Sequence, residues 1–517
     1  MSRFPVAPLL LSLVLASPTD AGDVPMPPEF KPVRDFIDGG MVAGQSPSLA
    51  VAVVKGDRVI WAEGFGFANV EDKIAATSDS IYLLASVSKP MTATGLMVLV
   101  DRGLVDLDRP VNGYLPGARI RACAGKADEM TVRRLANHTS GLPIHYNFYH
   151  DRISPLPWDE TIRRYGFAAH APGSRWEYSN LGFGILGYVT EVASKRPWRE
   201  FLEKEVFDPL GMTRTSDRAR PGLEAEATVQ YAPDAAGRFL RVEPYGFDHP
   251  GASALWSSAG DTARFVRMHL GGGILDGTRL LREESVQAMQ RMTGRSGPDA
   301  GTGIGWAVGT HMGQRCFWHS GGMPGVSTIV RAYPGAGCAT VVLANTHCGN
   351  FTSDVADRLA KVLLPGGAPP RGGDGARPLD FSPEAPQDQV GGTLVLPAAR
   401  SSGETSAELR GVWEGRLQHF DGDISLRLIV KDDGNVEVSF NGRRAGRLRD
   451  AKLRESGLTG RIVALIRTQR GFHGVPELEF RLERDGDRMT GVVVAMADGY
   501  FALSHWVEIE RKRGVRV

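Results

Sequence analysis

The chain has 517 residues, and its 60 Lys and Arg against 59 Asp and Glu give a formal net charge of +1. A chain of this length has room for two or more domains and a large hydrophobic core. The balanced charge, without a long basic or acidic block, argues against nucleic-acid binding and against an electrostatic membrane anchor. The composition is that of a soluble globular protein.

Residues 1–21 have the pattern of a secretory signal peptide. Arg3 supplies the charged start, and an apolar run follows over residues 8–16. This run is too short to span a bilayer as a helix. We therefore expect an exported protein, periplasmic or secreted, without an integral membrane segment.

Residues 28–365 mix strand and helix signals, which predicts an α+β domain. Strand signals lie at both ends of this region, over 48–55, 58–66, 315–319, 327–332 and 339–345. Helical patterns lie mostly between them, over 181–194, 201–210 and 262–270, and a last one lies over 351–364. We expect an antiparallel sheet made from both ends of the region, with a helical subdomain inserted.

The last part of the chain has a different pattern. Residues 366–407 are rich in Pro, Gly and Ser and predict a linker. Residues 408–517 show short strand signals at regular spacing, over 411–417, 424–430, 436–440, 462–468, 477–484, 491–497 and 501–509. They predict an all-β up-and-down barrel. We expect this barrel to fold separately and to adjust access or assembly rather than chemistry.

Four cysteines stand at positions 123, 316, 338 and 348. In an exported protein they allow three full disulfide pairings, among which the sequence does not choose. Their spacing is not that of a zinc site. We expect buried thiols, with or without one disulfide. His145 and His150 also lack metal-ligand spacing and are expected in a loop.

Ser86 and Lys89 form the one S-x-x-K pattern of the chain, and the apolar spacing after it predicts that Ser86 lies near a helix start. Residues three apart share a helix face. An amine one turn away takes the serine proton if burial or a second cation keeps it neutral. The helix N-terminus adds N–H groups that favour developing negative charge. The alternative is an ordinary helix with a capping serine and a surface lysine.

Tyr178-Ser179-Asn180 is the one Y-x-N pattern of the chain, and it precedes a predicted helix. A tyrosine oxygen beside a lysine ammonium has a lowered pKa and shares the work of the base. An asparagine amide can hold a substrate carbonyl and the lysine. The alternative is a helix N-cap with a packed tyrosine.

His319 is one of five histidines in an H-x-G pattern, so the pattern alone carries no information. Its context selects it, because it ends a predicted strand and opens the run His319-Ser320-Gly321-Gly322. Two glycines there let a substrate approach the strand backbone. The alternative is a strand end with a glycine turn. The G-x-G-x-x-G run over 182–187 lacks a surrounding βαβ unit, so it predicts close helix packing rather than nucleotide binding.

These motifs occur in the order and approximate spacing of one family. Over about residues 30–365 the chain resembles serine β-lactamases of class C and related D,D-peptidases of the penicillin-recognising group, D-aminopeptidases and esterases. Further stretches that carry the resemblance are Asn137-His138-Thr139-Ser140-Gly141-Leu142, Pro209-Leu210-Gly211-Met212 and Gly305-Trp306. Some relatives carry a C-terminal barrel resembling lipocalins, which fits residues 408–517. The clearest departure is His319, where the β-lactamases have lysine.

The resemblance implies a hydrolase in which Ser86 forms an acyl-enzyme while Lys89 and Tyr178 move the protons. It implies that the backbone N–H groups of Ser86 and Gly322 form the oxyanion hole. It further implies substrate contacts from Asn180, His319, Ser320, Gly321 and Gly322. Neither a cofactor nor a metal is needed.

The substrate class stays open between a D-amino-acid peptide or amide, an ester and a β-lactam. We expect a small-molecule or peptidoglycan-derived substrate and no nucleic-acid partner. The alternative function is a penicillin-recognising sensor or cell-wall binding protein that acylates without turnover. Residues 144–171 and 222–250 are expected to line the cleft and set specificity.

His319 bears on this choice through its charge. With an unperturbed pKa of about 6.5, it is mostly neutral in alkaline buffer and charged toward pH ~6. We therefore expect weak binding of carboxylate substrates in alkaline buffer and better binding near pH ~6. Uncharged esters or amides should be preferred.

Overall fold

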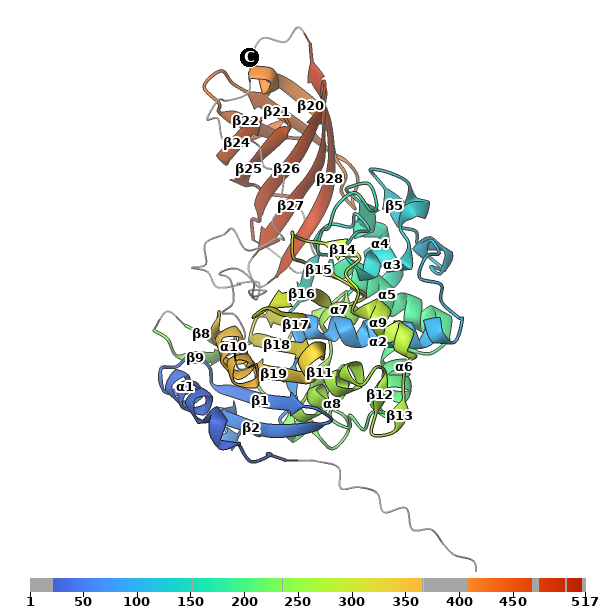
Figure 1. Cartoon of the computed structure of the whole chain (residues 1–517). Helices are drawn as coiled ribbons and strands as arrows, with labels where there is room; N and C mark the ends of the chain where they lie inside the picture. Colours follow the sequence, from blue (N-terminus) through green and yellow to red (C-terminus); the bar gives the residue numbers. More distant parts are fainter. Residues whose placement is uncertain are drawn as a thin grey trace, which may run out of the picture.

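The structure is a computed structural model, which describes residues 22–150, 153–234, 236–364, 366, 407–466, 474–497 and 500–513. The predicted signal peptide over 1–21 and nearly all of the predicted linker lie outside these residues. Figure 1 shows an α/β region, coloured blue to yellow, and a sheet of C-terminal strands, coloured orange to red.

A nine-stranded antiparallel sheet forms the centre of the first region, in the order β14-β15-β16-β17-β18-β19-β1-β2-β3. The strands from the N-terminal end, β1 (Ser48–Lys55) and β2 (Arg58–Asn69), pair onto β19 (Cys338–Ala344). The others are β3 (Ile74–Ala75), β14 (Gly294–Arg295), β15 (Ala300–Thr302), β16 (Ala307–His311), β17 (Gln314–Met323) and β18 (Val326–Tyr333). The prediction of a sheet made from both ends of the region is confirmed.

Both faces of this sheet are covered, as β1 shows. Successive side chains of a strand point to opposite faces. Leu49, Val51 and Val53 therefore pack in one cluster with α1 (Lys31–Val42) and α10 (Phe351–Leu363). The alternate residues between them join the large core cluster on the other face. Burial on both faces explains why the strand reads as an unbroken apolar run.

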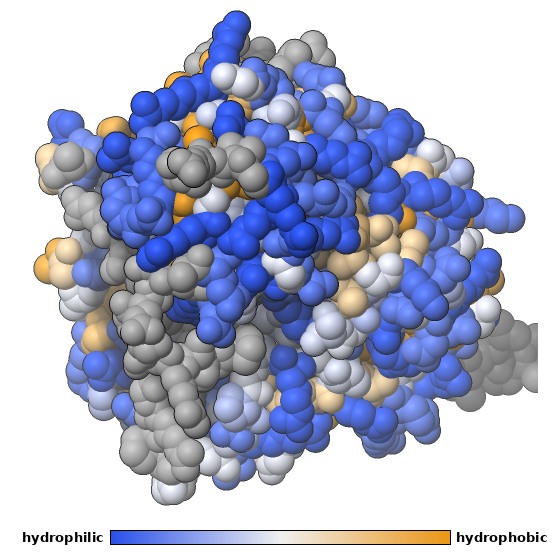
Figure 2. Space-filling model, turned by 90° about the horizontal axis from the view of Figure 1, so that it is seen from above, coloured by the Kyte–Doolittle hydropathy of each residue, from blue (hydrophilic) through white to orange (hydrophobic). Residues whose placement is uncertain are grey.

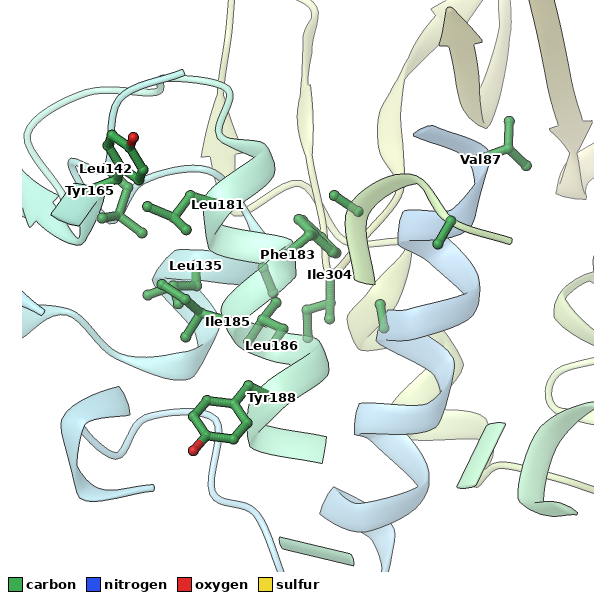
Figure 3. Packing of buried hydrophobic residues seen from close by; sticks show 14 of the residues in the cluster. Val87, Leu135, Leu142, Tyr165, Leu181, Phe183, Ile185, Leu186, Tyr188 and Ile304 are labelled. Carbon is green, nitrogen blue, oxygen red and sulfur yellow. The ribbon is translucent and has the colours of Figure 1, made fainter. Parts of the chain in front are cut away.

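The helical subdomain packs α2 (Ser88–Asp101) beside α5 (Asn180–Ser194), α7 (Pro250–Ser253) and α8 (Ala259–Leu270). Figure 3 shows the apolar side chains of α5 among neighbours from other elements, Leu135 and Ile304 included. A Cβ on Gly184 would lie 3.0 Å from the Cβ of His249, and one on Gly187 would lie 3.3 Å from the Cα of Gly251. The glycine run thus serves close packing on α7, as predicted.

Shorter elements connect these layers. The helices among them are α3 (Val132–Ala136), α4 (Trp158–Tyr165), α6 (Trp198–Leu202) and α9 (Glu283–Met289). The short strands are β4 (Tyr82–Leu83), β5 (Arg121–Ala122), β6 (Tyr146–Tyr149), β7 (Phe167–Ala168), β8 (Tyr231–Pro233), β9 (Phe239–Arg241), β10 (Gly246–Phe247), β11 (Trp256–Ser257), β12 (Ile274–Leu275) and β13 (Thr278–Arg279). The four cysteines form no disulfide in the described structure. None of the helices in the described ranges is long and apolar enough to cross a membrane.

The C-terminal strands form a nearly closed antiparallel barrel-like sheet, in the order β23-β22-β21-β20-β28-β27-β26-β25-β24. They are β20 (Gly411–Leu417), β21 (Ile424–Val430), β22 (Val436–Phe440), β23 (Arg443–Arg447), β24 (Arg449–Arg454), β25 (Gly457–Val463), β26 (Glu477–Asp485), β27 (Arg488–Ala497) and β28 (Phe501–Lys512). The first strand, β20, pairs with the last, β28, and from there each strand pairs with the next one in sequence, up to β23 on one side and down to β24 on the other. The up-and-down arrangement is therefore confirmed. Figure 2, which views the molecule from above, shows a mostly hydrophilic surface on this side.

The barrel is joined to the first region through β6. Asn147 and Tyr146 on β6 pair with Phe501 and Ala502 on β28, so β6 extends the barrel sheet. A hydrophobic cluster crosses the same junction; it contains Leu83, Ala85, Ile144, Met323 and Val326 from the first region and Val492, Val494, Ala502 and Trp506 from the barrel. The cluster that joins the barrel to the first region thus includes Ala85, the residue before Ser86. Its separate folding stays a prediction.

Trp506 tests this junction, because it is 4% exposed within the shared cluster. We expect Trp506→Ala to lower the free energy of unfolding by about 3–5 kcal/mol, the usual cost of emptying a large aromatic site. The matched control is Leu465→Ala, since Leu465 is 76% exposed, and surface changes usually stay within about 0.5 kcal/mol. Calorimetry measures both, and unchanged melting of Trp506→Ala would contradict the packing.

Candidate active site

Ser86 lies in a single 3-10 turn, Ala85–Val87, directly before α2, and its side chain is buried. Ala85, the residue before it, has φ +49°, a left-handed conformation that is uncommon for a residue with a Cβ. Strand β17 passes beside this turn. A Cβ on Gly321 of β17 would overlap the Leu84 carbonyl oxygen and Thr328 Oγ1, so glycine is what allows this approach.

Lys89, one turn into the same segment, is fully buried. Its Nζ lies 3.1 Å from Ser86 Oγ, 2.7 Å from Asn180 Oδ1 and 3.1 Å from the Ala252 carbonyl oxygen. Burial holds the pKa of Lys89 well below its usual value, because an ammonium is costly away from water. The site therefore favours the neutral amine.

The hydrogen-bond count decides where the lone pair of that amine points. A neutral amine has two N–H groups and one lone pair. The oxygens of Asn180 and Ala252 are acceptors only, so each takes one N–H. The lone pair is left for the third neighbour, Ser86, whose hydroxyl then donates to Nζ. This is the arrangement that a general base needs before it removes a serine proton.

Tyr178 contacts the same hydroxyl, because its OH donates to Ser86 Oγ at 2.9 Å. Burial, with Tyr146 as a smaller contribution, raises the pKa of Tyr178 well above its usual value and outweighs the hydrogen bond to Ser86. This corrects the expectation of a lowered tyrosine pKa, because burial dominates the surroundings of the phenol. The phenol stays protonated and donates.

Two further residues set the place of Tyr178. The His138 ring packs on it with centroids 4.5 Å apart, and His138 Nδ1 accepts the backbone N–H of Ser179 at 3.2 Å. Ser179 caps α5 by accepting the Gly182 N–H at 3.2 Å. Asn180 starts that helix, and its Nδ2 donates to the His145 carbonyl oxygen at 2.8 Å. Asn180 is thus placed on Lys89, one of its two expected roles.

His319, Ser320, Gly321 and Gly322 lie on β17, where His319 pairs with Val330 and Gly322 with Ser327 of β18. His319 is 9% exposed, and its Nδ1 donates to the Ser320 carbonyl oxygen at 2.7 Å. Burial, and then Lys89, lowers the pKa of His319 to about 3. This corrects the expectation that His319 gains charge near pH ~6, because the ring stays neutral well below that pH.

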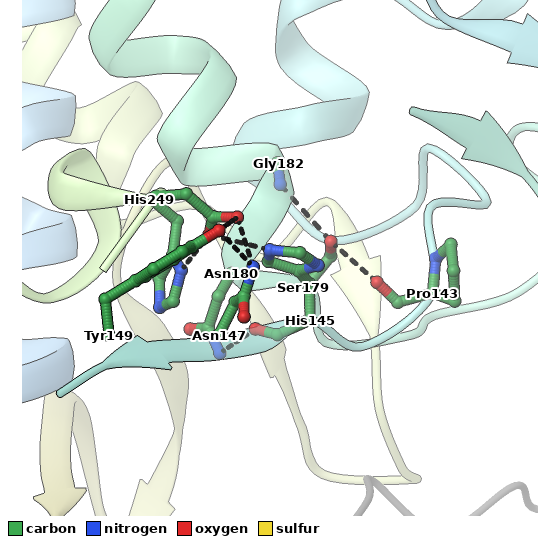
Figure 4. Close-up of polar contacts among 9 residues, drawn as sticks. Pro143, His145, Asn147, Tyr149, Ser179, Asn180, Gly182 and His249 are labelled. Atoms are coloured by element: carbon green, nitrogen blue, oxygen red, sulfur yellow. Dashed lines mark hydrogen bonds and ion pairs between the residues drawn. The ribbon is translucent and has the colours of Figure 1, made fainter. Parts of the chain in front are cut away.

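A second polar cluster, which the sequence did not indicate, lies behind Asn180 (Figure 4). Asp248 accepts from His145 Nε2 at 2.9 Å, His249 Nδ1 at 3.0 Å, Asn147 Nδ2 at 2.6 Å and Tyr149 OH at 3.4 Å. All five side chains are buried. His145 lies in the loop directly before β6, as expected, but its side chain is buried and bonded to Asp248. Its partner Asp248 is 103 positions away, so no local pattern signals the contact.

The His145, Asp248 and His249 ligand atoms lie within 4.8 Å of one another, close enough to hold a metal ion. The hydrogen bonds to Asp248 account for the same closeness.

The two segments expected to line the cleft, 144–171 and 222–250, do meet, since β6 pairs with β10.

Comparison with known proteins decides the family. The model of the Beta-lactamase family matches residues 33–364. The chain belongs to this family. It is 30% identical over 340 residues to penicillin-binding protein 4 of Amycolatopsis lactamdurans, covering 60% of this chain and 85% of that protein. It is 26% identical to penicillin-binding protein 4* of Bacillus subtilis, covering 55% of this chain and 64% of that protein.

The fold is also that of a solved structure, the octameric penicillin-binding protein homologue from Pyrococcus abyssi. The TM-score is 0.57 at 22% identity, over 91% of this chain and 99% of that one. The likeness thus extends to the C-terminal barrel-like sheet. Members of the beta-lactamase family are generally serine hydrolases that work through acylation of a serine.

The buried Lys89 amine also predicts how stability depends on pH. An unfolded lysine has a pKa of about 10.4, and the folded pKa is lower. Between the two values the unfolded state binds more protons, so wild-type stability rises with pH. We expect Lys89→Met to lack this rise. In urea unfolding, the free energy of unfolding of wild type should therefore increase relative to that of Lys89→Met from pH ~7 to ~10. Lys126→Met, at an exposed lysine, is the control. Parallel wild-type and Lys89→Met curves would contradict the burial of a neutral amine.

Proposed function

We propose that this protein is a serine hydrolase that acts on an ester or amide carbonyl through an acyl-enzyme at Ser86. The observation that carries the proposal is the set of three contacts of Lys89, which leaves the lone pair of a neutral amine on the Ser86 hydroxyl. Pure binding needs no such base. Membership of the beta-lactamase family supports the same chemistry.

In the first step Ser86 gives its proton to Lys89 Nζ, and the Oγ–carbon bond forms as the carbonyl electrons move onto oxygen. We assign the N–H groups of Ser86 and Gly322 to that oxyanion; losing one such donor typically costs about 3 kcal/mol. The carbon–leaving-group bond then breaks. Tyr178 gives its proton to the leaving nitrogen or oxygen and is reprotonated from the Lys89 ammonium. Water releases the acyl group by the same steps in reverse.

The substrate we propose is an uncharged ester or amide, D-amino-acid peptides or amides included, in preference to a β-lactam. The motivation is His319, which is neutral and stands where the β-lactamases carry lysine. A neutral ring offers no fixed positive charge to a substrate carboxylate. Two relatives are named penicillin-binding proteins, which fits a small-molecule ligand. With residues 1–21 as a signal peptide, we place the reaction in the periplasm or outside the cell.

Acylation of Ser86 is the direct test. Incubation with a fluorophosphonate should add one adduct to the intact mass of wild type and none to Ser86→Ala. Ser88→Ala is a matched control, because Ser88 lies two residues on and is also buried, but its Oγ accepts the Leu255 N–H instead of contacting Lys89. A full adduct on Ser86→Ala would refute the assignment. A burst of product without turnover would instead favour the acylated sensor.

His319→Lys tests the substrate preference. It should raise kcat/KM for a cephalosporin relative to a neutral p-nitrophenyl ester by roughly 10-fold or more, because a charge-assisted hydrogen bond is worth about 1.5–3 kcal/mol. In wild type the same ratio should stay flat between pH ~8 and ~6, since the pKa of His319 is lowered to about 3. Efficient cephalosporin turnover by wild type, with a ratio that His319→Lys leaves unmoved, would contradict the preference.

A further inference from the structure

Both acceptors that orient Lys89 are linked through chains of hydrogen bonds to one buried carboxylate, that of Asp248. On one side His145 bonds to Asp248, and the His145 carbonyl oxygen accepts Asn180 Nδ2, which fixes the Oδ1 that Lys89 uses. On the other side His249 bonds to the same Oδ1 of Asp248. His249 directly precedes α7, and its carbonyl oxygen accepts the N–H of Ala252, whose own carbonyl oxygen is the second acceptor of Lys89.

We propose that Asp248 is a positioning residue for the proton transfer between Ser86 and Lys89, because it fixes the two oxygens that aim the Lys89 lone pair. The proposal deepens the proposed function and rests on it. Within the part of the chain that the structure describes, Asp248 makes no hydrogen bond to Ser86 or Lys89. It acts through Asn180 on one side and through α7 on the other.

The construction of the cluster supports this role. A fully buried carboxylate is costly unless its oxygens are satisfied. The oxygens of Asp248 accept from His145, Asn147 and Tyr149 of one distant segment and from the adjacent His249. Burial opposes ionisation, but His145 and His249 outweigh it and hold the pKa of Asp248 below its usual range. The charged carboxylate therefore draws the His145 segment and the start of α7 toward one point.

The same carboxylate connects the site to the barrel. Asn147, whose Nδ2 donates to Asp248 Oδ2, lies on β6 opposite Phe501 of β28. Tyr149 at the end of β6 donates to the same oxygen. The edge of the barrel sheet thus supports the residues that hold Asp248 in place.

The test is Asp248→Asn, which keeps the shape but removes the charge and one acceptor. We expect the acylation rate at saturating neutral ester to fall about 10²-fold, the scale of a misplaced catalytic group, with substrate affinity unchanged. Asp261→Asn is the matched control: Asp261 is also a buried carboxylate, bonded to Arg214 N and Thr215 Oγ1, but it is outside this cluster. Its acylation rate should equal that of wild type. An equal rate loss in both variants, or a loss in affinity alone, would overturn the role.

A double-mutant cycle separates positioning from general stability. If Asp248 acts partly through Asn180, Asp248→Asn should slow acylation several-fold less in an Asn180→Ala background than in wild type. If the two residues act independently, Asp248→Asn should slow acylation by the same factor in both backgrounds. Should Asp248→Asn fail to fold, His145→Phe is the second variant. It keeps an aromatic ring and the backbone carbonyl but removes the Nε2 that bonds to Asp248. It should show the same loss of rate at unchanged affinity, and a wild-type rate would overturn the proposal.

Two readouts are independent of the proposed hydrolase activity. A crystal structure of Asp248→Asn should show Lys89 Nζ beyond hydrogen-bond distance of Asn180 Oδ1, Ala252 O or both; three unchanged contacts would overturn the proposal even if the wild type proved inactive. Metal analysis tests whether His145, Asp248 and His249 bind a metal ion instead. One equivalent of bound metal, whose removal by a chelator stops acylation, would show that the cluster is a metal site and would overturn the proposed role. Acylation that a chelator leaves unchanged supports positioning by hydrogen bonds.

Discussion

The burial of one amine is the constraint on which the site depends. In water Lys89 would be an ammonium with three donors and no capacity to accept a proton. Enclosed by α2, α5 and α7, it is driven toward the neutral form, and its neighbours then fix its direction. The same enclosure keeps Tyr178 and His319 uncharged. Burial thus sets the protonation of all three groups, and among the residues that the structure describes no carboxylate hydrogen-bonds to Ser86.

Both the sheet and the helices position the residues around Ser86 and Lys89. The 3-10 turn with Ser86 lies against β17, where Gly321 leaves room for it. The helix α5 brings Tyr178 and Asn180 to its N-terminal end, and the close contact of its glycines with α7 brings Ala252 within reach of Lys89. Packing distances between backbones, rather than long flexible side chains, therefore set the geometry.

Much of the fold follows from local pattern, and the exceptions have physical causes. The bounds of β20, β21 and β22 were predicted to the residue. In β21 and β22 apolar and polar positions alternate at the strand period. Strand β23 was missed, because its Arg-rich sequence has no apolar face and it lies at the sheet edge. Strand β6 was also missed, because it is only four residues long and buried on both faces, so it shows no alternation.

The site divides in the same way. Ser86 and Lys89 were recognisable because one helical turn joins them, and Tyr178 and Asn180 because they stand at a helix start. The structure brings these four side chains together. Asp248 was not recognisable, since its partners come from a distant segment. The charge states of Tyr178 and His319 were misjudged for a related reason, because desolvation is a property of the whole enclosure and not of neighbouring sequence.

The pairing of β6 with β28 has a consequence for the order of events during folding. Ser504 of β28 and Ile144 beside β6 meet across 360 positions of sequence. Contacts of such separation form late, because closing the intervening chain costs entropy before any contact repays it. A nascent chain therefore carries β6 with an uncovered edge until its last strands have been made. The strand that pairs with the Asn147 segment, and so flanks the Asp248 cluster, is therefore the last to be synthesised.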